Sequence, residues 1–188
     1  MNENLMVLLE HQLGEAAAQD LVNLMHIPDL FSCGESGKVT RAELAQALNM
    51  LLFSGVLERV PSGRQYTQEI VTRGEKVMLD HGALRTVRWL DSGQLPSGEV
   101  AITRILRPLG YCLNGVYPLE KLKMTGRSYA HLDDPENISQ FFVSELHPER
   151  FSIPFQQAVS RVIGQSRDPL TPAAVAQLHA LERDGHLP

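Results

Sequence analysis

The sequence contains only two cysteines, Cys33 and Cys112, in 188 residues. They lie far apart and form no CxxC pair, which excludes a disulfide framework and a cysteine-rich zinc site. No apolar run reaches the ~18 residues that a membrane helix needs. The N-terminus also lacks the basic-then-apolar pattern of a signal peptide. We therefore expect a cytoplasmic protein without a membrane partner.

Positive charge is scarce as well. Seventeen lysines and arginines stand against 22 acidic residues, a net charge of −5 at neutral pH. Nucleic acids and anionic lipids attract basic surfaces, so this balance argues against both as partners. The hydrophobic share of 43% and the charged share of 21% are ordinary for a globular domain and exclude a disordered chain.

Familiar catalytic signatures are missing too. The chain has no GxSxG, no Walker A motif, no GxGxxG after a strand, and neither HExxH nor HxH. Any catalytic or metal site must therefore be assembled from residues that the fold brings together.

The first 30 residues favour helix, because leucines recur there at helical spacing. Thr40 and Glu43 have the spacing of a capping box, which predicts that a helix over residues 41–53 begins there. A short hairpin over residues 56–66, with Pro-Ser-Gly at its turn, is expected to follow.

Helices followed by a β-wing are also the outline of a winged helix. A non-catalytic, winged-helix-like module that binds DNA or another protein is therefore the alternative interpretation. The helix over residues 41–53 carries Arg41 as its only base. Since phosphate contacts need several lysines and arginines, a helical subdomain that packs on the next unit is favoured.

From residue 76 the pattern changes to β-α-β-β-β. We expect a curved, antiparallel sheet that is covered by one helix. The fold class is thus α+β, with a helical N-terminal subdomain (1–75), one β-α-β-β-β module (76–150) and a helical C-terminal tail (151–188). The predicted strands cover residues 77–89, 111–118, 124–132 and 138–147, and the predicted helix covers residues 98–109.

Side chains alternate along a strand, so His81, Ala83 and Arg85 should share one face of the first strand. An imidazole can bind a metal through a ring nitrogen, and a guanidinium can bind a carboxylate with two parallel hydrogen bonds. The pattern therefore indicates a hollow with a metal-binding end and a carboxylate-binding end. The alternative for His81 is a purely structural histidine.

Two further candidates lie on the later strands. Glu145 has bulky apolar neighbours and needs a partner, which we expect to be Arg85, Arg127 or a metal. His131 ends its strand and either joins the site or stabilises the following turn. Two histidines and one carboxylate form the ligand set of a non-haem iron site, so His81, His131 and Glu145 are the metal candidates. A structural salt bridge is the alternative for Glu145.

The stretch Asp80-His81-Gly82-Ala83-Leu84-Arg85 resembles the 2-oxoadipate dioxygenase/decarboxylase family, also known as the 2-hydroxyglutarate synthases. The motif of that family is a His-Gly-Ala-(Leu/Ile)-Arg strand. Similar stretches cover residues 105–117, 124–151 and 167–173, so nearly the whole chain resembles the N-terminal part of the family. The resemblance implies a vicinal-oxygen-chelate fold, whose building block is a β-α-β-β-β unit.

The resemblance also implies a mononuclear Fe(II) enzyme that converts 2-oxoadipate and O2 into 2-hydroxyglutarate and CO2 in lysine catabolism. His81 would match the first iron ligand, and Arg85 the catalytic arginine that holds a carboxylate of the 2-oxo dicarboxylic acid; both would bind substrate. The family's second histidine, in an Asn-His strand, and its glutamate have no counterpart here. The chain is then either the N-terminal part of such an enzyme, or a one-module relative whose site Glu145 or His131 completes, including across a homodimer. On either view this chain alone can fold and still be inactive.

Overall fold

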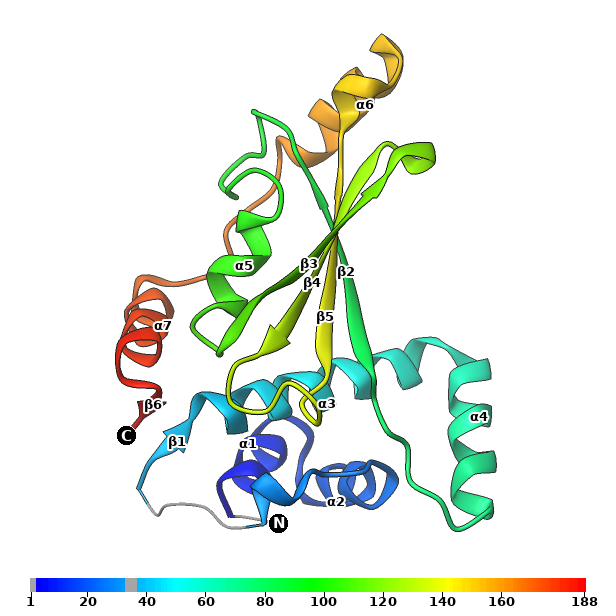
Figure 1. The fold of residues 1–188 in the computed structure, drawn as a ribbon, viewed down its shortest axis with the longest axis vertical. Coiled ribbons are helices and arrows are strands. Elements are labelled where there is room, and N and C mark those ends of the chain that lie inside the picture. The colour runs from blue at the N-terminus through cyan, green and yellow to red at the C-terminus, as the bar shows by residue number, and fades with distance from the viewer. Residues whose placement is uncertain (1–2, 33–36) are drawn as a thin grey trace.

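The structure is a computed structural model, and it describes residues 3–32 and 37–188. Figure 1 shows a four-stranded sheet that stands on a layer of N-terminal helices. The α-helices are α1 (Glu3–Leu13), α2 (Glu15–Leu24), α3 (Arg41–Arg59), α4 (Pro61–Thr72), α5 (Val100–Leu106), α6 (Ile153–Ile163) and α7 (Pro172–Asp184). The strands are β1 (Val39–Thr40), β2 (His81–Val87), β3 (Tyr111–Leu119), β4 (Met124–His131), β5 (Gln140–Leu146) and β6 (His186–Leu187). Cys33 lies outside the described residues.

The start of α3 confirms the predicted capping box. The Thr40 hydroxyl accepts a hydrogen bond from the Glu43 backbone N–H, and the Glu43 carboxylate accepts one of 2.6 Å from the Thr40 backbone N–H. Both bonds satisfy N–H groups that have no partner within the helix. The helix then continues to Arg59, beyond its predicted end at residue 53.

The hairpin predicted over residues 56–66 is wrong. Only Val60 interrupts the helical backbone, with φ −120° and ψ 93°, and α4 begins at Pro61. Proline is well tolerated at the first position of a helix, because the N–H that it lacks would have no helical partner there. Without a β-wing at this place, the winged-helix alternative loses the element that suggested it.

The large sheet has the strand order β2-β5-β4-β3. β3, β4 and β5 are antiparallel neighbours, as expected, but β2 pairs with β5 in parallel, so the expectation of an entirely antiparallel sheet is wrong. The reason is the helix between β2 and β3. It returns the chain to the end of the sheet where β2 began, so β3 and β5 both run in the direction of β2. The α+β class is confirmed, with a mixed sheet.

One face of this sheet is covered and the other is open. Tyr111, Tyr129, Phe141 and Val143 lie on the covered face and share one core with residues of α1, α2, α3 and α5. In Figure 1, α5 lies beside the sheet and α3 crosses below it. Cys112 on β3 is exposed.

The C-terminal tail is helical, as predicted, and also contains one unpredicted strand. Thr171 caps α7 by accepting a hydrogen bond of 3.1 Å from the Ala174 backbone N–H. β6 then pairs antiparallel with β1, which ties the end of the chain to the start of α3. Among the described residues, no helix combines the length and the apolar character that crossing a membrane requires.

Candidate functional site

The edge strand β2 sends alternate side chains to the two faces of the sheet. His81, Ala83 and Arg85 are exposed, whereas Gly82 and Leu84 are half-buried. His81 and Arg85 therefore share a face, as the alternation predicts. Four residues of strand separate their Cα atoms by about 13 Å. Only the ends of these two long side chains can approach a common ligand.

Asp80 orients the His81 ring. Nδ1 of His81 lies 2.5 Å from Oδ2 of Asp80, and the His81 side chain is 53% exposed. A carboxylate at one ring nitrogen favours the tautomer with the proton on that nitrogen, which leaves the lone pair of Nε2 available. No described residue bonds Nε2 of His81. The ring is thus held in the way that metal-binding histidines commonly are.

Ser144 fixes Arg85 from the neighbouring strand. Its hydroxyl donates to the Leu84 carbonyl at 3.4 Å, and the same oxygen accepts from Nε of Arg85 at 3.1 Å. Neither terminal nitrogen of Arg85 has a partner among the described residues. The guanidinium is therefore anchored at one edge and free to bind a carboxylate through the other.

The open face beside His81 is hollowed. A cavity of about 150 Å³ is bordered by the side of β2 and by residues of β4 and β5. The ring of Phe142 lies across Gly126, where a Cβ atom would come within 2.3 Å of it, and contacts the ring of Tyr117. The cavity is lined by Asp80, His81, Ser128, Gln140, Phe141 and Phe142.

Glu145 lies on the covered face, away from His81 and Arg85. Its register partner on β2 is Thr86, whose side chain is buried, and Glu145 itself is only 5% exposed. It accepts a 2.8 Å hydrogen bond from the Glu99 backbone N–H and lies 3.5 Å from Arg127. Arg127 is thus one of the three partners that the sequence left open for Glu145. The arrangement is the structural salt bridge that was the alternative for Glu145.

The pairs around Glu145 extend into a network that anchors the start of α5 on the sheet. Arg127 also bonds Glu99 at 3.0 Å, and the Tyr129 hydroxyl donates to the same carboxylate at 2.6 Å. Burial, followed by the bond to Glu99, raises the pKa of Tyr129, which keeps the hydroxyl protonated as the donor. Every charge in this network is committed to another protein group.

His131 is also on the covered face, and both of its ring nitrogens are used. Nε2 lies 2.8 Å from the Leu109 carbonyl, and Nδ1 accepts from the Asp133 backbone N–H at 3.1 Å. These partners require a neutral ring with its proton on Nε2. His131 therefore stabilises the turn after β4, and it is not brought together with His81.

The pH dependence of stability should report this burial of His131. Burial lowers the pKa of His131, so the folded state binds its proton less readily than the unfolded chain, whose histidines titrate near the ordinary value of 6.5. Stability from the neutral ring is complete above that pH and is lost progressively as the pH falls towards the lowered pKa. We expect the gap in unfolding free energy between the wild type and His131→Gln to narrow between pH 7.5 and about 5.5 in urea titrations. The matched control, His179→Gln at an exposed histidine, should leave the difference in unfolding free energy from the wild type constant with pH. A difference between the wild type and His131→Gln that also stays constant with pH would contradict the burial of a neutral His131.

The described residues fit one ligand position of the predicted Fe(II) site. His81 offers Nε2, but Glu145 and His131 do not share its face. Within residues 3–32 and 37–188, no group of three His, Cys, Asp or Glu side chains could hold a metal ion. A complete ligand set would need groups from outside this face of the sheet.

Asp80 and Ser144 are parts of this site that sequence reasoning missed. Alternation along the strand predicts that Asp80 faces away from His81 and does not join it. That prediction is wrong, because Asp80 precedes β2 and bonds the His81 ring. Ser144 contacts Arg85 only because β5 pairs with β2 in the observed register. The adjacency of Asp80 to the histidine was a usable signal, whereas nothing in the sequence shows the register.

No protein-family model matches the chain, and neither does any curated protein. The chain is 59% identical, over its whole length, to the "putative glyoxalase superfamily protein" of Ralstonia eutropha JMP134, whose crystal structure it matches with a TM-score of 0.95. It spans 58% of the length of that protein. The chain therefore has the fold of the corresponding part of a glyoxalase superfamily protein, also called the vicinal-oxygen-chelate fold.

Two more distant likenesses accompany this match. A "putative hydrolase" from Shewanella frigidimarina NCIMB 400 is 23% identical with a TM-score of 0.53, over 71% of this chain and 47% of the other, which is a likeness of fold alone. The hydroxyglutarate synthase from Pseudomonas putida is 15% identical with a TM-score of 0.43, over 97% of this chain and 36% of the other. That last similarity is too low to support an argument.

Proposed function

We propose that this chain supplies half of an Fe(II)-dependent site for the oxidative decarboxylation of a 2-oxo acid. The observation that carries the proposal is on the open face of β2, where His81 and Arg85 are each fixed by a neighbour and each keep a free binding end. The substrate would be 2-oxoadipate, and the products 2-hydroxyglutarate and CO2. The two products together contain the atoms of 2-oxoadipate and O2, so the reaction needs no further co-reactant.

Each residue of the open face has a defined task in this proposal. His81, held through Nδ1 by Asp80, presents Nε2 as one metal ligand. Arg85, held through Nε by Ser144, binds and orients a carboxylate of the substrate. Phe142 lines the cavity beside His81. An Fe(II) ion bound at His81 would activate O2, and the electrons that reduce O2 would come from the 2-oxo acid.

The remaining ligands would come from a second module. That module is either another part of a longer polypeptide or a second copy of this chain in a homodimer. The greater length of the Ralstonia protein, of which this chain spans 58%, supports the first source. Either source would close the open face and exclude solvent from it.

The test measures the oxygen-dependent release of CO2 from 2-oxoadipate. It uses the Fe(II)-loaded protein that contains residues 1–188 together with the second module. We expect turnover with 2-oxoadipate, none with adipate, and none in His81→Ala. Adipate is the matched control because it keeps both carboxylates but lacks the keto group. If no 2-oxo acid is consumed while the protein binds Fe(II) in full, the proposal is wrong.

Arg85→Lys should weaken the binding of 2-oxoadipate by ~2–4 kcal/mol. An ammonium is a point charge and cannot reproduce two parallel hydrogen bonds to a carboxylate, and lysine also lacks the Nε that Ser144 holds. Calorimetry on the anaerobic, metal-loaded polypeptide measures the change. Arg161→Lys on α6, an exposed arginine outside this face, is the control. Unchanged affinity in Arg85→Lys would remove Arg85 from the substrate site.

A further inference from the structure

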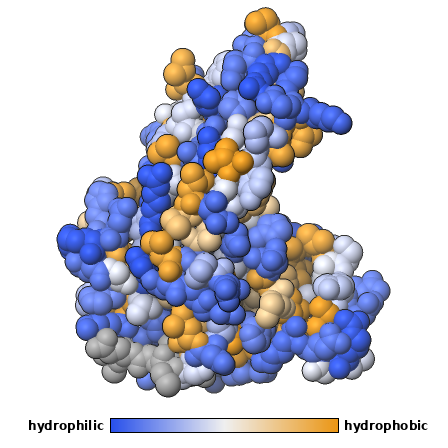
Figure 2. Space-filling view, in the orientation of Figure 1, coloured by the Kyte–Doolittle hydropathy of each residue, from blue (hydrophilic) through white to orange (hydrophobic). Residues whose placement is uncertain are grey.

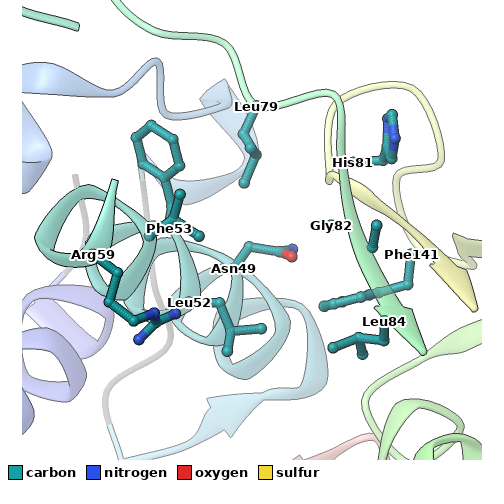
Figure 3. A pocket seen from close by; sticks show the side chains of 11 residues that line it. Asn49, Leu52, Phe53, Arg59, Leu79, His81, Gly82, Leu84 and Phe141 are labelled. Atoms are coloured by element: carbon teal, nitrogen blue, oxygen red, sulfur yellow. The ribbon is translucent and has the colours of Figure 1, made fainter. Parts of the chain in front are cut away.

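A second, larger cavity lies between α3 and the edge of β2. It has a volume of about 470 Å³, and the β2 residues 81–84, from both faces of the strand, border it. Figure 3 shows residues of α3 on one side of it and those of β2 and β5 on the other. Figure 2 shows hydrophobic surface where the upright sheet meets the helical base. The cavity is lined by Asn49, Leu52, Phe53, Val56, Arg59, Leu79, His81, Gly82, Ala83, Leu84 and Phe141.

The walls of this cavity are apolar and partly exposed. Leu52 and Val56, one turn apart on α3, are 43% and 41% exposed. Opposite them, Gly82 has no side chain, and a Cβ atom there would come within 3.1 Å of the Phe141 ring. The glycine of the His-Gly-Ala-Leu-Arg stretch thus lets the Phe141 ring pack closely against the strand. Exposed apolar walls around a hollow are typical of sites that bury the apolar body of a ligand.

Asn49 supplies a buried acceptor without a partner. The residue is 2% exposed, and its Oδ1 has no hydrogen bond. The Tyr111 hydroxyl donates to the Ser139 carbonyl at 3.0 Å, so its oxygen can only accept, and it takes the Asn49 amide N–H at 2.9 Å. These bonds fix which end of the amide is the free one. Figure 3 shows the Asn49 side chain pointing from α3 towards β2. Buried acceptors without partners are rare in folded proteins, which makes Oδ1 a candidate to receive a ligand's donor.

Arg59 supplies a positive charge at the other end of the cavity. Its guanidinium folds back over Gly55, where a Cβ atom would lie 3.2 Å from Nη1. No carboxylate among the described residues pairs with it. Six residues of helix separate Gly55 from Asn49, a rise of about 9 Å. That is close to the length of an extended eight-carbon chain.

We propose that this cavity is a binding site for a medium-chain carboxylic acid with a hydroxyl at its far end. The carboxylate pairs with Arg59, the hydrocarbon body covers Leu52, Val56 and Leu84, and the hydroxyl donates to Oδ1 of Asn49. The proposed ligand contacts use neither Arg85 nor the metal, although His81 also borders this cavity. The two sites therefore adjoin each other at His81 and differ in the groups that bind their ligands.

Calorimetric titration of the protein with 8-hydroxyoctanoate, octanoate and 1-octanol tests the site. We expect 8-hydroxyoctanoate to bind about threefold more tightly than octanoate, because its hydroxyl satisfies Asn49. Arg59→Gln should weaken both acids about fivefold and leave octanol unchanged, whereas Arg161→Gln should change nothing. If the hydroxyl weakens binding instead, Asn49 is not its partner and the proposal is wrong.

The location of the site is tested with a charge placed in the wall. Leu52→Glu should weaken both acids at least tenfold, since it puts a carboxylate among apolar side chains next to the acid. Leu122→Glu is the matched control, because Leu122 is equally an exposed leucine (57%) but lies on the far hairpin of β3 and β4. Equal loss in both variants, or no binding of either acid by the wild type, would overturn the proposal. Because no metal is added, these results are independent of the decarboxylase test.

Discussion

Replacing Gly98 with alanine is expected to lower the free energy of unfolding by about 3–5 kcal/mol. Gly98 has φ +64°, and a Cβ atom there would lie 2.0 Å from Oε2 of Glu145. That oxygen is the one that accepts from the Glu99 backbone N–H. The variant therefore loses stability in two ways. Alanine is strained in a left-handed backbone conformation, and its methyl group displaces the buried Glu145 carboxylate from its partners.

Gly185→Ala separates these two costs. Gly185 has φ +75°, but a Cβ atom there would meet nothing within 4 Å. Gly185→Ala should lower the free energy of unfolding only by the cost of the backbone conformation, about 1–2 kcal/mol. Guanidinium denaturation followed by circular dichroism measures the change. Equal losses at Gly98 and Gly185 would show that the carboxylate moves aside without cost.

A double-mutant cycle with Glu145→Ala sharpens the argument. Removing the Glu145 carboxylate removes the atom that the new methyl group would strike. The cost of Gly98→Ala should then fall by about 1–3 kcal/mol in the Glu145→Ala background. Additive losses would mean that Gly98 is needed for its backbone conformation only.

How much of this fold could be predicted depends on the range of the interactions. The capping box of Thr40 and Glu43 and the alternation within β2 are local, and both follow from a few neighbouring residues. Pro61 also acts locally, but proline suits a turn and a helix start equally. The packing of α3 and α4 decides between them, and that packing is not local.

The same distinction between local and long-range interactions applies to the candidate site. The shared face of His81 and Arg85 needs only the period of one strand. Whether Glu145 joins them depends on the register of β5 against β2, because a slip of one residue moves a side chain to the other face. The whole sheet determines that Thr86 pairs with Glu145 and that a helix packs on that face. Those contacts made Glu145 a structural residue, although its buried charge looked like a ligand.

Residues 1–188 alone are expected to bind Fe(II) or Mn(II) orders of magnitude more weakly than a complete two-histidine, one-carboxylate site. Too few metal ligands are available in this chain for tight binding. His81 presents Nε2 on the open face, while His131 has both ring nitrogens bonded and Glu145 is paired with Arg127 and the Glu99 backbone. One imidazole competes poorly with water for a divalent ion.

Anaerobic titration with Fe(II), with Mn(II) as a stable substitute, measures this affinity. His81→Ala should abolish the weak binding that remains, and Glu145→Ala, the control on the covered face, should leave it unchanged. Tight one-to-one binding that survives His81→Ala would refute the role of His81. Tight binding that is lost in His81→Ala and strengthens with protein concentration would place the missing ligands on a second copy of the chain. Weak binding that becomes tight only in a longer polypeptide would place the missing ligands in a second module of that polypeptide. The affinity of His81 alone does not distinguish that module from a second copy of the chain.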